Sequence, residues 1–187
     1  MKTDMRIVLT KQLLRKGLLS LIGKMPLSRI SVTALCQASG VNRATFYNHY
    51  DSVPMILREI VWEYAEKIET LYMKDIRSSH SEEHALETCL TYLQENKEEI
   101  IVLFSNNTES YIKGFGLEVV EDVIRRHRNE LRKQLNCSDD ELYLFLMTTA
   151  SGAYGLILTW LTRNMKQTPK EITAILRRLF SIRTIRP

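Results

Sequence analysis

The chain has 187 residues, of which 44% are hydrophobic and 26% charged, and its net charge is +4. This length suffices for one large core or for a small domain beside a medium one. Only seven glycines and four prolines are present, and no segment alternates apolar and polar residues over the length of a strand. The composition therefore argues against a sheet protein, and we predict an all-α fold.

The cysteines and the apolar residues indicate the compartment. Cys36, Cys89 and Cys137 are odd in number and widely spaced, which argues against a disulfide framework and against a zinc site built from cysteine pairs. The sequence contains no uninterrupted apolar run of 18 residues and no signal-peptide pattern. We therefore expect a cytoplasmic protein with no membrane partner.

Helical periodicity continues along the chain and predicts about nine helices. The first ends at Met25-Pro26, because proline does not continue a helix. Asp51-Ser52, followed by Pro54, marks the start of a long fourth helix, since proline is tolerated in a first turn. The predicted helices span residues 4–24, 32–39, 41–49, 53–76, 82–95, 97–104, 111–135, 138–163 and 169–182.

Residues 31–50 are the most informative part of the chain. Ser31 and Asn42 stand where each would cap a short helix, and Gly40 supplies the positive φ that a tight turn between the two helices requires. Phe46 and Tyr50, four residues apart, would lie on the buried side of the second helix. This is the pattern of a helix-turn-helix.

The other side chains of that second helix suit a nucleic-acid groove better than a core. Arg, Thr, Tyr, Asn and His on an exposed helix offer the hydrogen-bonding groups that contact bases and phosphates. Charge is concentrated in the same region: residues 1–50 hold eight Lys and Arg against one acid, a net +7, whereas the whole chain is only +4. Positive charge beside a helix-turn-helix indicates binding to a polyanion.

The motif itself reads Ser31-Val-Thr-Ala-Leu-Cys-Gln-Ala-Ser-Gly-Val-Asn-Arg-Ala-Thr-Phe-Tyr-Asn-His-Tyr50, with Gly-Val before the second cap and Thr-Phe-Tyr in the second helix. It resembles the motif of TetR/AcrR-type transcriptional regulators. Segments 92–97, 152–161 and 168–172 resemble one branch of that family. The resemblance implies a helix-turn-helix DNA-binding domain at residues 1–50, joined by a long helix to a helical ligand-binding and dimerisation domain at residues 51–187.

The resemblance also implies which residues meet double-stranded DNA. Arg43, Ala44 and Thr45 would lie nearest the base edges, where an Arg bidentate to guanine contributes about 1–3 kcal/mol of discrimination. The complete implied set is Thr33, Asn42, Arg43, Ala44, Thr45, Tyr47, Asn48 and His49.

One position departs from the family pattern. The family usually has a Lys at the start of the fourth helix, where it meets the DNA backbone, and this chain has Val53-Pro54 there. Either Lys24, Arg29 or the N-terminal Lys2 and Arg6 supply the charge instead, or DNA binding is weaker than usual. We favour compensation, because the region carries a net +7.

The last two predicted helices have the pattern of an interface. One of them carries apolar or small residues at spacings of 4, 3, 4, 3 and 4, which is an a/d seam. Two broad apolar faces at the C-terminal end favour a four-helix bundle with a second copy, and a homodimer would read a palindromic operator. The predicted interface residues are Leu142, Leu146, Thr149, Ala153, Leu156, Trp160, Ile172, Ile175, Leu176 and Leu179.

In this family the middle of the chain, about residues 78–137, encloses a ligand pocket. Aromatic residues of moderate polarity are the candidates for its lining, namely Tyr92, Phe104, Tyr111, Phe115 and Tyr143. The alternative is that these aromatics are simply core. Nothing in the sequence identifies the molecule.

Three functions from different classes follow. We favour a dimeric regulator of transcription, a repressor released by a small-molecule effector. The alternative is a ligand-independent adaptor or coactivator of the same fold that acts through protein partners. An enzyme has little support, because the sequence has no nucleophile elbow, glycine-rich phosphate loop or His-Glu-x-x-His motif. A lone histidine is more often a surface residue than a ligand, so we expect neither a metal nor a cofactor.

Overall fold

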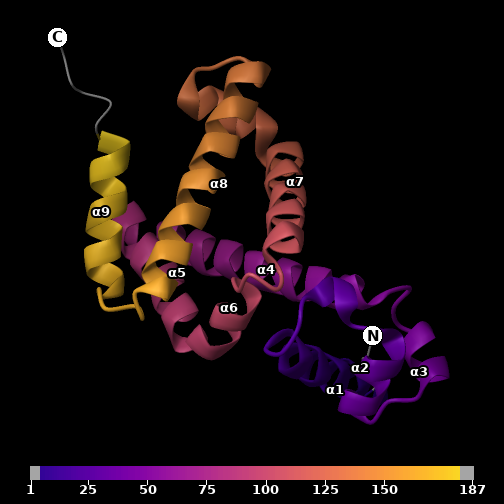
Figure 1. Ribbon diagram of the computed structural model, residues 1–187. Coiled ribbons are helices and arrows are strands. Elements are labelled where there is room, and N and C mark those ends of the chain that lie inside the picture. The colour runs from indigo at the N-terminus through magenta and orange to yellow at the C-terminus, as the bar shows by residue number, and fades with distance from the viewer. Residues whose placement is uncertain (1–4, 182–187) are drawn as a thin grey trace. The chain divides into compact units, whose positions relative to one another are not determined.

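The computed structural model describes the backbone of residues 5–181 and the side chains of residues 5–178. Within that range the protein has nine α-helices and no strand, so the all-α prediction is confirmed (Figure 1). Lys2 and residue 182 of the last predicted helix lie outside it. The helices are α1 (Met5–Ile22), α2 (Val32–Ser39), α3 (Arg43–Tyr47), α4 (Val53–Ser79), α5 (Glu82–Glu95), α6 (Lys97–Leu103), α7 (Glu109–Leu135), α8 (Asp139–Thr162) and α9 (Pro169–Ser181).

The chain divides into two compact units. Unit 1 comprises Met1–Glu63 with Ile101–Glu121, and unit 2 comprises Tyr64–Ile100 with Asp122–Pro187. Two long helices, α4 and α7, each begin in unit 1 and end in unit 2. The domain boundary predicted at residue 50 stays a prediction.

Unit 1 depends on a close contact between α1 and α2. Leu14 and Leu18 of α1 and Leu35 of α2 are completely buried. Gly17 lies at the point of closest approach, where a Cβ atom would stand 2.9 Å from the Cβ atom of Ser39 and 3.1 Å from its backbone nitrogen. Since real Cβ atoms do not approach so closely, the contact requires glycine.

Gly17→Ala is expected to lower the free energy of unfolding by about 1–3 kcal/mol, because the added methyl group overpacks this contact. Urea denaturation measures the change. Gly114→Ala is the matched control: a Cβ atom there meets nothing within 4 Å, and replacing a helix glycine by alanine stabilises by up to about 1 kcal/mol. Equal stabilities of the two variants would contradict the close contact.

Asn107, in the polar segment before α7, caps the C-terminal end of α1. The side-chain amide of Asn107 donates a 2.7 Å hydrogen bond to the carbonyl of Ile22, the last residue of α1. The backbone N–H of Leu27 donates in turn to the carbonyl of Asn107 at 2.9 Å. The carbonyl of Ile22, left without an intrahelical partner at the helix end, is therefore satisfied by a residue 85 positions away in sequence.

In unit 2, α9 packs on α5. Ala85 of α5 and Thr173 of α9 are completely buried, and Ile172 is only 3% exposed. An ion pair between Arg177 and Glu83 joins the same two helices. Part of the apolar face of α9 is thus buried against α5 of the same chain.

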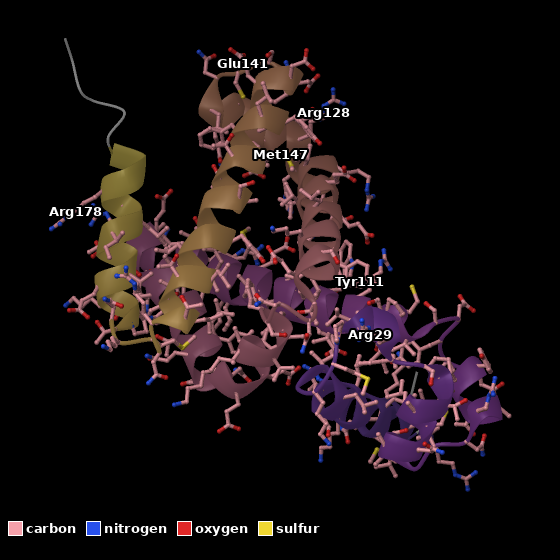
Figure 2. All side chains as sticks on the ribbon, in the orientation of Figure 1. Arg29, Tyr111, Arg128, Glu141, Met147 and Arg178 are labelled. Atoms are coloured by element: carbon pink, nitrogen blue, oxygen red, sulfur yellow. The ribbon has the colours of Figure 1, made fainter. Side chains whose placement is uncertain are left out.

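The second half of α7 and the first turn of α8 meet at a tight turn. Ser138 and Glu141 form a capping box, in which the Ser138 hydroxyl accepts from the backbone N–H of Glu141 and the Glu141 carboxylate accepts from the backbone N–H of Ser138. Arg128 of α7 forms an ion pair with Asp139 of α8. Figure 2 labels Arg128 and Glu141 at this turn.

Candidate functional site

Side-chain caps define both helices of the predicted helix-turn-helix. The Ser31 hydroxyl accepts a 3.1 Å hydrogen bond from the backbone N–H of Ala34, and the Asn42 side chain accepts a 2.7 Å bond from that of Thr45. Gly40 ends α2 with φ +69°. All three predicted roles are confirmed. Because Asn42 is the cap, α3 begins one residue later, and it is shorter than the predicted helix over residues 41–49.

The two sides of α3 have opposite environments. Phe46 is completely buried and Tyr50 is 7% exposed, with their ring centroids 6.2 Å apart. Tyr47 is 51% exposed. The predicted inward and outward directions of these aromatic residues are therefore confirmed. The other residues assigned to DNA are exposed (Thr33, Asn42, Arg43, Ala44 and Asn48) or half-buried (Thr45 and His49).

A hydrogen bond joins two of these exposed residues. The Arg43 guanidinium, on α3, donates to the Thr33 hydroxyl, on α2, at 3.4 Å. Arg43 stands ten residues away from Thr33 in sequence, so the bond depends on the fold of the turn. It holds the guanidinium at one end of the exposed face of α3.

The start of α4 carries no cation. Val53 is the first residue of α4 and its side chain is 4% exposed, so it belongs to the core of unit 1. Of the basic residues named as compensating charges, Arg6, Lys24 and Arg29 are exposed. Lys24 and Arg29 therefore offer charge for a phosphate backbone elsewhere in unit 1.

Two other basic residues of α1 are engaged by acids of α4. Lys11 lies 2.7 Å from Glu59, and Arg15 forms an ion pair with Glu63. Tyr50 hydrogen-bonds to the same Glu59, and burial together with that bond raises the pKa of Tyr50 above its ordinary value. These five residues line a cavity of about 300 Å³. They hold α1 and Tyr50, three residues after the end of α3, against the first turns of α4. They also reduce the free positive charge of residues 1–50.

The predicted ligand-contacting aromatics fall into both units. Phe104, Tyr111 and Phe115 belong to unit 1, and Tyr92 and Tyr143 belong to unit 2. The rings of Tyr111 and Phe115 are 6.2 Å apart, and Tyr92 lines a cavity of about 590 Å³ with residues of α4 and α5. Tyr143 is 45% exposed on α8. Their assignment to one ligand site stays a prediction.

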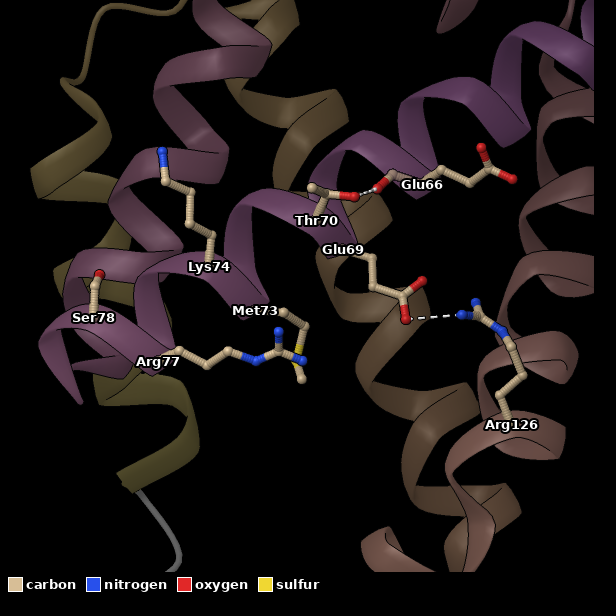
Figure 3. A pocket seen from close by; sticks show the side chains of 8 residues that line it. All are labelled: Glu66, Glu69, Thr70, Met73, Lys74, Arg77, Ser78 and Arg126. Atoms are coloured by element: carbon tan, nitrogen blue, oxygen red, sulfur yellow. Dashed lines mark hydrogen bonds and ion pairs between the residues drawn. The ribbon is translucent and has the colours of Figure 1, made fainter. Parts of the chain in front are cut away.

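A larger cavity, of about 850 Å³, lies in unit 2 beside the second half of α4 (Figure 3). This volume is within the range of small-molecule sites, roughly 300–1,000 Å³. Sequence reasoning missed it, because its lining is charged and contains none of the five predicted aromatics. The lining residues are Glu66, Glu69, Thr70, Met73, Lys74, Arg77 and Ser78 of α4 and Arg126 of α7.

The face of α8 that the chain leaves uncovered lacks charge. From Leu142 to Thr162 the helix has no charged residue, and only 11% of its most apolar 18-residue window is buried. By length and composition α8 could cross a membrane, although a single such helix is weak evidence for that. We predicted no such helix, because the sequence has no uninterrupted apolar run of 18 residues. An uncovered, uncharged face indicates contact with another molecule.

Burial corrects part of the predicted interface. Leu142, Trp160 and Ile172 are 1%, 2% and 3% exposed within the single chain. They have no surface left for a second copy, so we do not assign them to the interface. Ile175 is 39% exposed, and the other predicted residues with described side chains are half-buried; the Leu179 side chain lies outside the described residues. Between residues 142 and 159 of α8, the exposed residues are Tyr143, Leu144, Thr148, Ser151, Gly152, Gly155 and Thr159.

The cysteines are free thiols. Cys36 and Cys89 are buried, and Cys137 is half-buried. Burial raises the pKa of Cys89 to about 11, so this thiol stays protonated near neutral pH. Among residues 5–178, no three His, Cys, Asp or Glu side chains gather as a metal site.

Comparison with known proteins identifies the class and then the family. Residues 81–181 match the model of a transcriptional regulator C-terminal region, which places the protein among transcriptional regulators. The chain belongs to the TetR family, which is non-enzymatic and binds DNA. The matched segment includes residues 92–97, 152–161 and 168–172, whose sequence resembles one branch of the family, whereas the helix-turn-helix at residues 31–50 precedes it.

A solved structure shows the same fold. The chain is similar to the crystal structure of a TetR transcriptional regulator from Streptococcus agalactiae 2603V, with a TM-score of 0.63 and 24% identity. The similarity covers 92% of this chain and 93% of that chain. No curated protein sequence matches this chain.

Proposed function

We propose that this TetR-family regulator is a dimer that reads DNA sequence with α3. The observation that carries the proposal is the two-sided environment of α3, with Phe46 fully buried and Tyr47 half exposed beside the exposed Arg43. A short helix that is anchored on one side and presents Arg, Tyr and Asn on the other suits the major groove.

Dimerisation would lengthen the DNA site that the protein recognises. One recognition helix covers few base pairs, whereas two helices held about 34–36 Å apart reach successive major grooves of a palindrome. The uncovered, uncharged side of α8 supports a second copy as the partner, because it carries no charge between residues 142 and 162 and its Ser151, Gly152 and Gly155 permit close packing.

The effector belongs to the same proposal. A small molecule bound in unit 2 would act as an inducer, releasing a repressor from its operator. It shifts DNA affinity only through its own difference in affinity for the DNA-bound and free shapes, and a tenfold effect requires about 1.4 kcal/mol. The cavity beside α4 supports such a site.

An adaptor that acts through protein partners is the second candidate. The pairing of Lys11 with Glu59 and of Arg15 with Glu63, together with the buried Val53, favours it, because these features reduce the cations available for phosphates. Selection from a library of genomic fragments separates the two candidates. A recovered palindrome supports the regulator, and no enrichment over random fragments supports the adaptor.

Arg43→Ala is expected to relax sequence preference at one base pair of each half-site, because a bidentate contact from Arg to guanine contributes about 1–3 kcal/mol. Competition binding with single-base variants of the selected site measures this change. Arg29→Ala is the control: Arg29 is exposed outside α3, so its loss should weaken all sites alike. An unchanged base preference in Arg43→Ala would contradict the assignment.

A further inference from the structure

Some charged side chains around the 850 Å³ cavity form ion pairs and others do not. Arg126 lies 2.8 Å from Glu69, and His127 lies 3.2 Å from the same carboxylate. The hydrogen bond from Arg126, followed by that from His127, holds the pKa of Glu69 below its ordinary value. Glu69 is therefore ionised and matched, and Figure 3 shows its bond to Arg126 spanning the cavity from α4 to α7.

Two cations of the lining remain unmatched. Lys74 and Arg77 are exposed, and neither has a hydrogen bond or ion pair with any described side chain. By contrast, Arg128, Arg132 and Arg177 of the same unit each lie against a carboxylate. One end of the cavity thus keeps two positive charges that no acid among the described side chains pairs with.

The other end of the cavity, at Glu66, is far from Lys74 and Arg77. The remaining acid of the lining, Glu66, precedes Lys74 by eight residues and Arg77 by eleven, about 12 and 16 Å along a helix. Between them lie the half-buried Met73 and the methyl group of Thr70. Methionine adapts its shape to an apolar occupant. The cavity therefore has a cationic end at Lys74 and Arg77, with Met73 beside it and the matched Glu69–Arg126 ion pair beyond Met73.

We propose that this cavity binds an amphipathic organic anion, with its carboxylate or phosphate at Lys74 and Arg77 and its apolar chain or ring along Met73. The inference rests on the proposed function, for which it names the chemical class of the effector. The occupant would touch α4 over three turns and reach the Glu69–Arg126 ion pair. An occupant there would alter how α4 and α7 are tied within unit 2.

Calorimetric titration of the full-length protein, without DNA, tests the proposal. The probes are decanoate and decyltrimethylammonium, which share a ten-carbon chain and differ in the sign of the head group. We expect decanoate to bind once per chain, with a dissociation constant at least about tenfold below that of the cation. Equal binding of both probes, or no binding of decanoate, would overturn the proposal.

The variant K74Q/R77Q identifies the site. Both side chains are exposed, so the melting temperature should not change, whereas the dissociation constant for decanoate should rise about tenfold. R163Q/K166Q removes two exposed cations after α8, away from this lining, and should bind decanoate like the parent. Unaltered binding by K74Q/R77Q would place decanoate elsewhere and overturn the assignment. Because no DNA is present, failure to select an operator would contradict the proposed function without changing this result.

Discussion

Monomers are the expected result of Gly152→Arg. Gly152 lies on the exposed side of α8, and a Cβ atom added there meets nothing within 4 Å, so a single chain tolerates the side chain. In a two-fold interface the new Arg would be buried near its own symmetry mate without a partner charge. An uncompensated buried charge costs about 3–5 kcal/mol, which raises the dimer dissociation constant at least about a hundredfold.

Sedimentation velocity measures the oligomeric state, and circular dichroism checks that the helices remain. Gly114→Arg is the matched control: it also adds Arg to an exposed helix glycine with open space around it, and it should remain a dimer. Operator affinity should fall in the Gly152 variant alone, because two half-sites are no longer bound as one unit. A dimeric Gly152→Arg protein would move the interface to another surface.

The local features of the helix-turn-helix could be predicted because they depend on near neighbours. A cap such as Ser31 or Asn42 bonds to a backbone N–H three residues ahead, and Gly40 is required by its own φ. The opposite directions of Phe46 and Tyr47 follow from helical periodicity alone. Sequence therefore suffices for the parts of the site that lie within one turn.

The long-range features could not be predicted in this way. Both sides of α8 are free of charge between residues 142 and 162, so spacing alone could not tell which side the chain buries. Trp160 shows the consequence: it is 2% exposed, and its indole N–H donates to the carbonyl of Gln167 within the chain. The partners of Lys11 and Arg15 are likewise 48 residues away in sequence.

The 850 Å³ cavity beside α4 escaped prediction for a related reason. The predicted lining is aromatic, whereas the cavity is lined by seven residues of α4 and by Arg126 of α7. From sequence alone, a run of charged residues along one helix predicts a face exposed to solvent. Only the approach of α7, with Arg126 bonded to Glu69, encloses part of that face.

Loss of folded unit 1 is the expected result of Phe46→Ala. Phe46 is completely buried and packs against Tyr50, with Tyr47 edge-on at 5.2 Å between ring centroids. Truncation of a buried Phe to Ala costs about 3–5 kcal/mol, which is a large share of the roughly 5–15 kcal/mol that stabilises a typical domain. Hydrogen exchange of the backbone amides in α2 and α3 measures the effect locally.

Tyr47→Ala separates folding from contact with DNA, because it removes the next side chain on the same helix. Tyr47 is 51% exposed but lies edge-on to Phe46, so its truncation should lower the free energy of unfolding by about 0.5–1.5 kcal/mol, well below the cost of Phe46→Ala. If Tyr47 contacts a DNA phosphate, Tyr47→Ala weakens binding to all sites alike, whereas Phe46→Ala abolishes binding through unfolding. Full DNA affinity in a folded Tyr47→Ala protein would mean that Tyr47 does not face the duplex. The proposal that α3 is the recognition helix would then depend on Arg43 alone.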